Sequence, residues 1–308
     1  MAGPGRVGSV GAGLAVVLVD VMIAAGLADA APERGPRTQG SPAPWLVVHL
    51  PGEQAQADEV APALGAVGVV ELPTAAEWLA ACLQPGAEAS GDVVHVFGAV
   101  GGAGASTVAI ACASARAPDC LLVDVDPGST GLDLPLGIGA GEGGRWTAVP
   151  DSGQPLLAES LRAALPEVGG FHVLTGPPLQ PGDQRPGWVL AGARPGFGSV
   201  VVDGGQGGGP AWVDPGDRVI IVLPATLPGV VGARRLMEVS AGHPVLLAVR
   251  PSSWLDVRDV ADQLGGAAVL EVPTWRGLGE AADCGDVLGG RRGRAVRQLG
   301  QRCWEALA

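Results

Sequence analysis

The sequence predicts an α/β fold built on a parallel sheet, and three observations support it. Apolar runs of four to seven residues alternate with helix-like segments along most of the 308 residues, which is the order that builds parallel sheets. Most of these runs are apolar throughout, as expected for strands covered on both faces. A glycine-rich turn also joins one strand directly to a helix, a connection at which α/β proteins bind ligands.

The first predicted unit, residues 1–83, is a small series of three strands and three helices. Its order favours a parallel sheet and resembles the back half of a flavodoxin-like or receiver-like domain with a truncated front half. We expect strands at Leu14–Val19, Trp45–Leu50 and Val67–Leu72, and helices at Met22–Ala30, Ala57–Leu64 and Ala75–Leu83.

Asp20 ends the first strand, where a receiver holds its phosphoacceptor. A working receiver also needs a lysine, and the chain contains none, since all 19 basic residues are arginine. A phosphoryl group needs cationic partners. The residues therefore favour a docking module that is not phosphorylated over a phospho-switch.

A linker of glycine, proline and serine composition, residues 84–91, precedes the second predicted unit, residues 92–290. Long apolar runs again alternate with helical segments, and glycine- and proline-rich stretches at 137–155, 176–187 and 204–216 are expected to be loops. We expect strands at Val93–Gly98, Cys120–Val125, Phe171–Thr175, Ser199–Asp203, Arg218–Leu223, Val245–Val249 and Ala268–Val272, and helices at Ser106–Arg116, Leu156–Leu165, Leu227–Ala241 and Asp256–Leu264.

Composition narrows the class of protein. With 47% hydrophobic and 16% charged residues, the chain can bury a large core. The net charge of −12 disfavours nucleic-acid binding by the surface as a whole, and no sequence-specific nucleic acid is expected as a partner. The apolar stretch Val7–Ala31 superficially resembles a signal peptide, but Asp20 interrupts it. We therefore expect a cytoplasmic protein.

The cysteines and histidines lack the spacing of metal or catalytic sites. We expect the cysteines to be buried thiols in a reducing cytosol, and the histidines to be structural. The residues are Cys82, Cys112, Cys120, Cys284 and Cys303, with His49, His95, His172 and His243.

The glycine-rich turn Gly101–Thr107 lies between a predicted strand and a predicted helix. Glycines let backbone N–H groups converge on an anion at the positive end of a helix. Because 51 glycines are spread through the chain, this turn alone is weak evidence. The acidic strand ends that follow it make the pattern specific.

Two later strands end in aspartate. Leu121–Val123 runs into Asp124 and Asp126, which are followed by Pro-Gly, and Val200–Val202 runs into Asp203. The carboxyl ends of parallel strands share one edge of the sheet, where ligands bind. Carboxylates at that edge can hold Mg²⁺ through water and orient a nucleophilic water.

These three segments resemble the deviant Walker A loop, the switch I strand and the Walker B strand of the MinD/ParA family of P-loop ATPases. The loop wording Gly-Gly-x-Gly-Ala-Ser-Thr is similar to that of CpaE-like proteins. The order of a receiver-like front, this loop and a basic tail resembles the septum-site-determining (Ssd) proteins of high-GC Gram-positive bacteria. The motifs are specific within 96–134 and around 199–203, and loose elsewhere.

The resemblance implies ATP and Mg²⁺ as cofactors and a role for each motif residue. Asp126 would orient the attacking water, Asp203 would contact Mg²⁺ through water, and Asp124 would support the metal shell. The Ser106 hydroxyl would be a Mg²⁺ ligand. The residues that would surround the phosphates are Gly101, Gly102, Ala103, Gly104, Ala105, Ser106 and Thr107.

The loop departs from the family pattern at both of its lysines. Val100 replaces the signature lysine that reaches across a dimer, Ala105 replaces the lysine that bridges the β- and γ-phosphates, and Ala99 replaces the first glycine. Losing one charge-assisted hydrogen bond weakens binding by about tenfold to a hundredfold. Hydrolysis suffers more, because the lysine neutralises charge that develops in the transition state. Arg145 and Arg250 are candidate substitutes that the sequence does not place.

The C-terminal segment 291–308 predicts a basic amphipathic helix. Two readings are open: a peripheral helix at the inner face of the membrane, or a helix whose apolar stripe docks on the domain and whose arginines stay solvated. The stripe consists of Val296, Leu299, Cys303, Trp304 and Leu307.

The resemblance implies a positioning or regulatory protein in septum-site determination and cell division, with weak ATP binding and little or no hydrolysis. Three alternatives stay open: an active Mg²⁺-dependent ATPase that cycles between monomer and homodimer, a CpaE-like localisation factor for pilus or secretion assembly, and a nucleotide-independent scaffold. The expected partners are cell-division proteins or, under the CpaE-like alternative, pilus and secretion proteins.

Overall fold

The N-terminal unit contains a three-stranded parallel sheet. The computed structural model describes residues 17–20, 45–64, 66, 68–72, 76, 91–139, 141, 143–150, 156–176, 179–180, 183–206, 213–253 and 255–308. Strands β1 (Val17–Asp20), β2 (Trp45–His49) and β3 (Gly68–Glu71) pair in that order, and helix α2 (Gln54–Leu64) packs on β2 and β3. The helices expected at Met22–Ala30 and, apart from Ala76, at Ala75–Leu83 lie outside the described residues. The receiver-like character of this unit stays a prediction.

The second unit is built on an eight-stranded sheet in the order β11-β10-β9-β4-β8-β5-β7-β6. Every neighbouring pair is parallel except β6 and β7. The seven strands that the sequence predicts are all present, and the α/β fold class is confirmed. The strands are β4 (Asp92–Gly98), β5 (Cys120–Asp124), β6 (Glu167–Val168), β7 (Phe171–Leu174), β8 (Ser199–Gly205), β9 (Arg218–Pro224), β10 (Val245–Arg250) and β11 (Ala268–Glu271).

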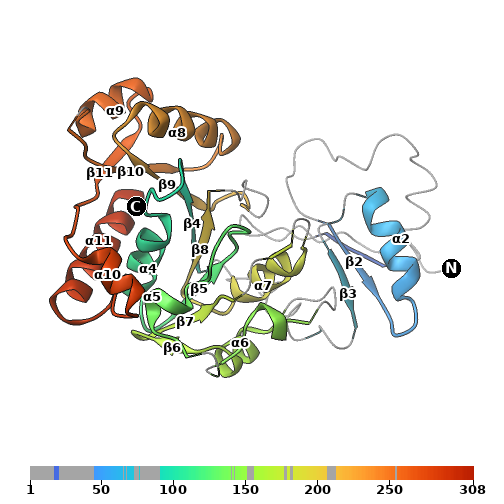
Figure 1. Cartoon of the computed structure of the whole chain (residues 1–308). Coiled ribbons are helices and arrows are strands. Elements are labelled where there is room, and N and C mark those ends of the chain that lie inside the picture. Colours follow the sequence, from blue (N-terminus) through green and yellow to red (C-terminus); the bar gives the residue numbers. More distant parts are fainter. Residues whose placement is uncertain are drawn as a thin grey trace.

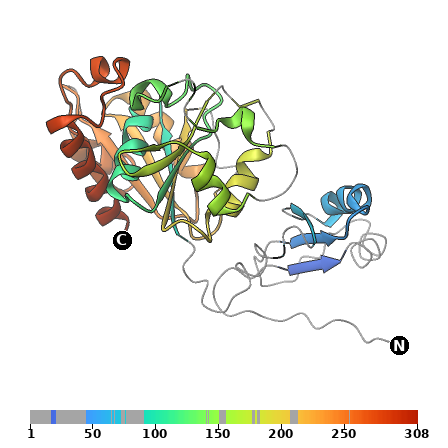
Figure 2. The same cartoon turned by 90° about the horizontal axis from the view of Figure 1, so that it is seen from below.

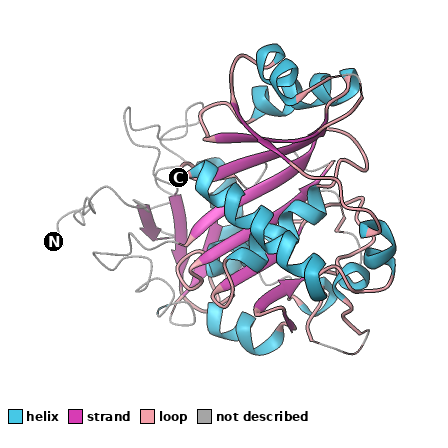
Figure 3. Ribbon diagram, turned by 90° about the vertical axis from the view of Figure 1, so that its left-hand side faces the viewer, coloured by secondary structure: helices cyan, strands magenta, loops and turns pink. Residues whose placement is uncertain are grey.

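Helices cover both faces of this sheet (Figures 1 and 3). Side chains of β4, β9 and β10 alternate between two apolar layers, which explains why these strands read as continuous apolar runs. One face packs against α4 (Ala105–Ala115), α5 (Asp133–Leu136), α10 (Leu278–Asp283) and α11 (Gly290–Leu307). The other packs against α6 (Ala158–Ala164), α7 (Arg185–Ala193), α8 (Leu227–Val239) and α9 (Val257–Gln263), with the 3₁₀ turn η1 (Trp146–Ala148).

Four elements are absent from the sequence-based prediction. Helix α7 begins inside the stretch expected to be a loop, because Pro186 occupies its first turn, where a proline starts a helix rather than breaking it. Strand β6 has two residues, α5 has four and α10 has six, so none is long enough to show a period.

Helix α11 lies alongside α4 (Figures 1 and 2). The backbones approach closely, since a Cβ on Gly300 would lie 1.9 Å from the carbonyl oxygen of Ala111. The indole of Trp304 donates a hydrogen bond of 3.1 Å to the carbonyl of Cys112. Val296, Leu299, Cys303 and Trp304 are buried, so the apolar stripe docks on the domain, as one of the two sequence-based readings expects.

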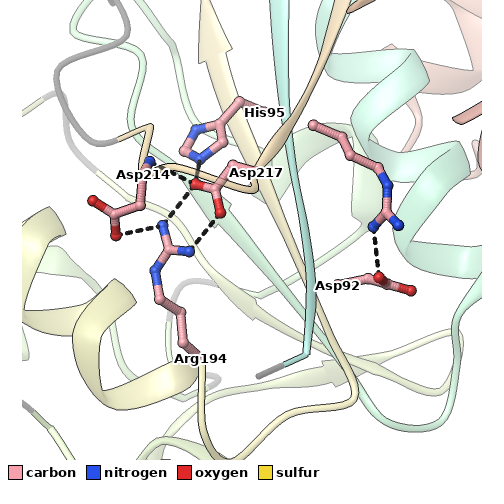
Figure 4. A network of polar contacts seen from close by, with 6 residues as sticks. Asp92, His95, Arg194, Asp214 and Asp217 are labelled. Carbon is pink, nitrogen blue, oxygen red and sulfur yellow. Dashed lines mark hydrogen bonds and ion pairs between the residues drawn. The ribbon is translucent and has the colours of Figure 1, made fainter. Parts of the chain in front are cut away.

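A buried polar network ties the amino-terminal part of β4 to the segment before β9 (Figure 4). His95 shares a hydrogen bond of 2.9 Å with Asp217, whose two carboxylate oxygens also accept hydrogen bonds of 2.6 and 2.7 Å from Arg194. Asp214 pairs with the same guanidinium at 3.1 Å. His95 therefore has a structural role.

The other histidines and the cysteines carry no cluster of chemistry in the described residues. His49 contacts the carbonyl of Leu50, and His172 lies edge-on to Phe197. The expectation of buried thiols is wrong for Cys284, which is exposed because it follows the end of the short surface helix α10. Cys112, Cys120 and Cys303 are buried, and none of these four cysteines forms a disulfide. Among the described helices, none could span a membrane.

Candidate functional site

The glycine-rich loop joins β4 to α4 and needs glycine at two points. Gly102 has φ 69° and Gly104 has φ 104°, conformations that side chains disfavour. Gly104 is the N-cap of α4. The first-turn N–H groups of a helix lack intrahelical partners, so the loop presents amides and the positive end of the helix dipole to any anion beside it.

The predicted aspartates meet behind this loop. Asp124 at the end of β5 is paired in register with Asp203 on β8. The Asp126 carboxylate reaches across to β8, since a Cβ on Gly205 would lie 1.8 Å from its Oδ2. Side chains 79 positions apart in the sequence therefore converge on one edge of the sheet.

Asp203 is fully buried and only partly hydrogen-bonded. Its Oδ1 accepts a hydrogen bond of 3.3 Å from the amide of Gly205, and its Oδ2 has no hydrogen-bond partner. Burial, and then the neighbouring charge of Asp124, raises the pKa of Asp203 to about 7, although the nearby Ser106 hydroxyl opposes the rise. A carboxylate in this position is short of positive charge.

Asp124 is held by hydroxyl groups. Its Oδ2 accepts hydrogen bonds of 2.9 Å from Ser129 and 3.0 Å from Thr175, and its Oδ1 accepts one of 3.3 Å from the amide of Asp126. Burial raises the pKa of Asp124 to about 6, against the effect of these hydrogen bonds. Asp124 supports the site from behind and does not line the cleft described next.

A cleft of about 850 Å³ opens above the loop, a volume in the range of small-molecule sites. One wall is the loop itself and the opposite wall is the segment after β11, which is largely apolar. Asp126 and Arg250 are the charged residues among those that line it. The lining consists of Gly98, Val100, Gly101, Gly102, Ala103, Gly104, Ala105, Ser106, Thr107, Val108, Asp126, Gly128, Gly205, Gln206, Arg250, Val272, Pro273, Thr274, Trp275, Leu278, Gly279 and Ala282.

The structure separates the two arginine candidates. The Arg250 guanidinium donates a hydrogen bond of 3.2 Å to the carbonyl of Gly102 and so lies on the loop. Arg145 lies elsewhere, in an ion pair of 3.2 Å with Asp133 and a hydrogen bond of 3.0 Å to the carbonyl of Gly139. Only Arg250 is placed to face a ligand in the cleft.

Other lining residues escape prediction from the sequence. Gln206 lies over the loop, since a Cβ on Gly101 would lie 3.2 Å from its Oε1. Trp275 and Pro273 supply the far wall from a segment that carries no motif. A weak signal existed for Gln206, because it follows the acidic end of β8 by three residues.

The residues fit a Mg²⁺ ion near Ser106 and Asp203. The unpartnered Oδ2 of Asp203 and the adjacent Ser106 hydroxyl are oxygen donors of the kind that Mg²⁺ prefers. A divalent cation would also offset the repulsion between Asp203 and Asp124. When bound, it would neutralise charge on phosphate oxygens.

Solved structures share this architecture. The MinC:MinD cell division protein complex of Aquifex aeolicus superimposes with a TM-score of 0.56, at 19% identity over 70% of this chain and 96% of that one. A ParA family ATPase of Chlorobium tepidum TLS gives 0.54, at 15% identity over 70% and 99%. The chain has the MinD/ParA P-loop fold. These identities show the MinD/ParA fold alone.

Curated relatives add no activity. Two proteins of Mycobacterium tuberculosis, from strains CDC 1551 / Oshkosh and ATCC 25618 / H37Rv, are each 33% identical over 236 residues, and both are named only as uncharacterized proteins. The match covers 70% of this chain and 62% of each relative, so the chain spans less than two thirds of their length. No protein-family model matches the chain.

Proposed function

We propose that this chain is a MinD/ParA-type positioning or regulatory protein that binds ATP weakly with Mg²⁺ and hydrolyses it slowly or not at all. One observation carries the proposal: the glycine-rich loop, Asp126 and the buried Asp203 converge at a single cleft. A mere tight turn in an inert sheet gives no reason for a buried carboxylate without a partner beside a loop of free amides.

Weak hydrolysis follows from the loop residues. Val100 and Ala105 line the cleft at the two positions where the family carries lysine, and neither can donate a charged hydrogen bond. Stabilisation of the transition state is the term that suffers most, because phosphoryl transfer depends on cations placed where charge develops. Binding depends also on the loop amides and therefore survives better.

Septum-site determination is the role we assign within cell division. The CpaE-like loop wording and the Ssd-like order of segments support it, and two of the solved structures with the same fold are named as cell division proteins. Cell-division proteins are therefore the proposed partners, and a homodimer the proposed assembly. A CpaE-like role in pilus or secretion assembly is the alternative. We place the protein in the cytoplasm; contact with the membrane through 291–308 would have to use the exposed arginines of α11, because its stripe is buried.

Titration with a fluorescent ATP analogue tests the binding proposal. We expect saturable binding that requires Mg²⁺ and weakens at least tenfold in Asp203→Asn, which removes the buried carboxylate with little change in shape. Asp262→Asn, an exposed aspartate on α9, is the matched control and should bind as the wild type does. No saturable binding by the wild type would favour the nucleotide-independent scaffold.

A turnover assay separates weak binding from enzyme activity. We expect phosphate release at the background level with saturating Mg²⁺ and ATP. Release that is well above background and vanishes in Asp126→Ala would instead identify an active Mg²⁺-dependent ATPase, since Asp126 is the residue proposed to orient the attacking water.

A further inference from the structure

We propose that Arg250 is the cation that holds the phosphates in this cleft, in place of the lysines that the loop lacks, and that it makes the site selective for nucleoside di- and triphosphates. The inference rests on the proposed nucleotide binding and adds a residue and a ligand class to it.

The position of Arg250 is fixed by the sheet. It is the last residue of β10, in register with Pro224 on β9, and its carbonyl accepts a hydrogen bond of 2.8 Å from the amide of Ala225. Its side chain extends from this anchored backbone to the loop. A Cβ on Gly104 would lie 3.9 Å from its Nη1 and 4.0 Å from its Cδ. The guanidinium therefore lies against the middle of the loop, at the amino terminus of α4.

The guanidinium has charge to spare. Among the residues that the structure describes, its partner is the neutral carbonyl of Gly102, and no carboxylate lies within ion-pair distance. An arginine offers five N–H donors, so a single bond to Gly102 leaves several for an anion. Arg145 and Arg194, in contrast, are paired with aspartates.

The chemistry of the cleft selects the anion. The loop amides and the end of the α4 dipole favour negative charge at the same place as the guanidinium, and a guanidinium binds phosphate through paired N–H donors. Asp126, the other charged residue of the lining, repels an anion unless a cation screens it. A ligand with several phosphates and its own Mg²⁺ satisfies both conditions, whereas a nucleoside satisfies neither.

Variants at one position test this assignment. Fluorescent ATP and ADP analogues are titrated into the wild type, Arg250→Ala and Arg250→Lys, and adenosine affinity is measured by competition. We expect Arg250→Ala to weaken ATP and ADP binding by about tenfold to a hundredfold and to leave adenosine unchanged. Arg250→Lys should recover part of the loss, because it keeps the charge and loses the paired geometry. Arg258→Ala, an exposed arginine on α9, is the matched control.

The outcomes separate the inference from the function on which it rests. Wild type that binds no nucleotide overturns both. Wild type that binds, with Arg250→Ala binding ATP equally well, overturns the role of Arg250 and leaves nucleotide binding intact. An equal loss for ATP and adenosine would show that the residue supports the fold and does not hold phosphate. Circular dichroism of each variant, and the affinity of Arg250→Lys, distinguish a lost charge from a lost structure.

Discussion

Two buried aspartates at opposite ends of the sheet are in contrasting electrostatic situations. Burial raises the pKa of Asp203 to about 7, because no cation among the described residues compensates it. Burial acts on Asp217 in the same direction, but hydrogen bonds and charges from Arg194 and His95 outweigh it and lower the pKa to about 2. A satisfied network is typical of structure and an unsatisfied carboxylate is typical of a ligand site.

Asp217→Asn should destabilise the fold by about 3 kcal/mol at pH 7, because it leaves the buried Arg194 guanidinium with only the exposed carboxylate of Asp214. Urea unfolding at pH 7 measures this, with Asp262→Asn as a control expected to change stability by less than about 0.5 kcal/mol. A loss as small as the control's would mean that the network contributes little to stability.

The same residue predicts a pH dependence. The pKa of Asp217 in the folded state, about 2, lies below its ordinary value of 3.8, so the unfolded chain takes up the proton first as pH falls. The stabilisation, about 2 kcal/mol, is complete above pH 4 and is lost as pH falls through 2. The difference between wild type and Asp217→Asn should therefore shrink between pH 4 and pH 2. A difference that stays constant over this range would contradict the assignment.

Restoring the missing lysine should strengthen nucleotide binding. Ala105 lies at the start of α4 and lines the cleft, so a lysine there can point its ammonium toward bound phosphate. We expect Ala105→Lys to bind the ATP analogue about tenfold to a hundredfold more tightly than the wild type. Ala306→Lys adds the same charge at an exposed site on α11 and should leave the affinity unchanged. Unchanged affinity in a folded Ala105→Lys would argue against phosphate beside the helix terminus.

At the scale of elements, prediction from the sequence worked where a pattern was long. The strands of the large sheet were found because each is a run of buried apolar residues, and α4, α8 and α9 because their segments were long enough to show a period. Helix α7 was missed because Gly187 and Pro186 are typical of loops, although proline is tolerated in a first helical turn. The position of α11 depends on its packing against α4, which the helical pattern alone does not fix.

Close contact between α11 and α4 predicts that Gly300 tolerates no side chain. A methyl group there would meet the Ala111 carbonyl at 1.9 Å and the Ala115 side chain at 2.9 Å. Gly300→Ala should therefore destabilise the fold by about 1–3 kcal/mol, even though alanine favours helix. Gln301→Ala, one position further on the exposed face, should be neutral or slightly stabilising. Thermal unfolding of both variants measures the difference, and a stabilised Gly300→Ala would mean that the helices do not touch here.

At the scale of the whole molecule, the sequence placed the aspartates but not the cation. Parallel strands share an edge, so Asp124, Asp126 and Asp203 could be brought together from their positions at strand ends. Arg250 is 148 positions from the Gly102 that it contacts. Its role depends on β10 lying two strands from β4 and on where a long side chain points. Sheet order and side-chain direction follow from the packed fold and from no local motif.

The oligomeric state is the whole-molecule property that most directly tests the missing signature lysine. In the family that the loop resembles, this lysine reaches the partner's nucleotide and couples dimerisation to ATP. Val100 occupies its position and is an uncharged side chain at the cleft, so we expect the molar mass from light scattering to be the same with and without Mg²⁺ and ATP. Val100→Lys supplies the missing group, and a nucleotide-dependent rise in mass confined to this variant would support that explanation. A doubling of mass in the wild type on addition of ATP would instead favour the active ATPase cycle.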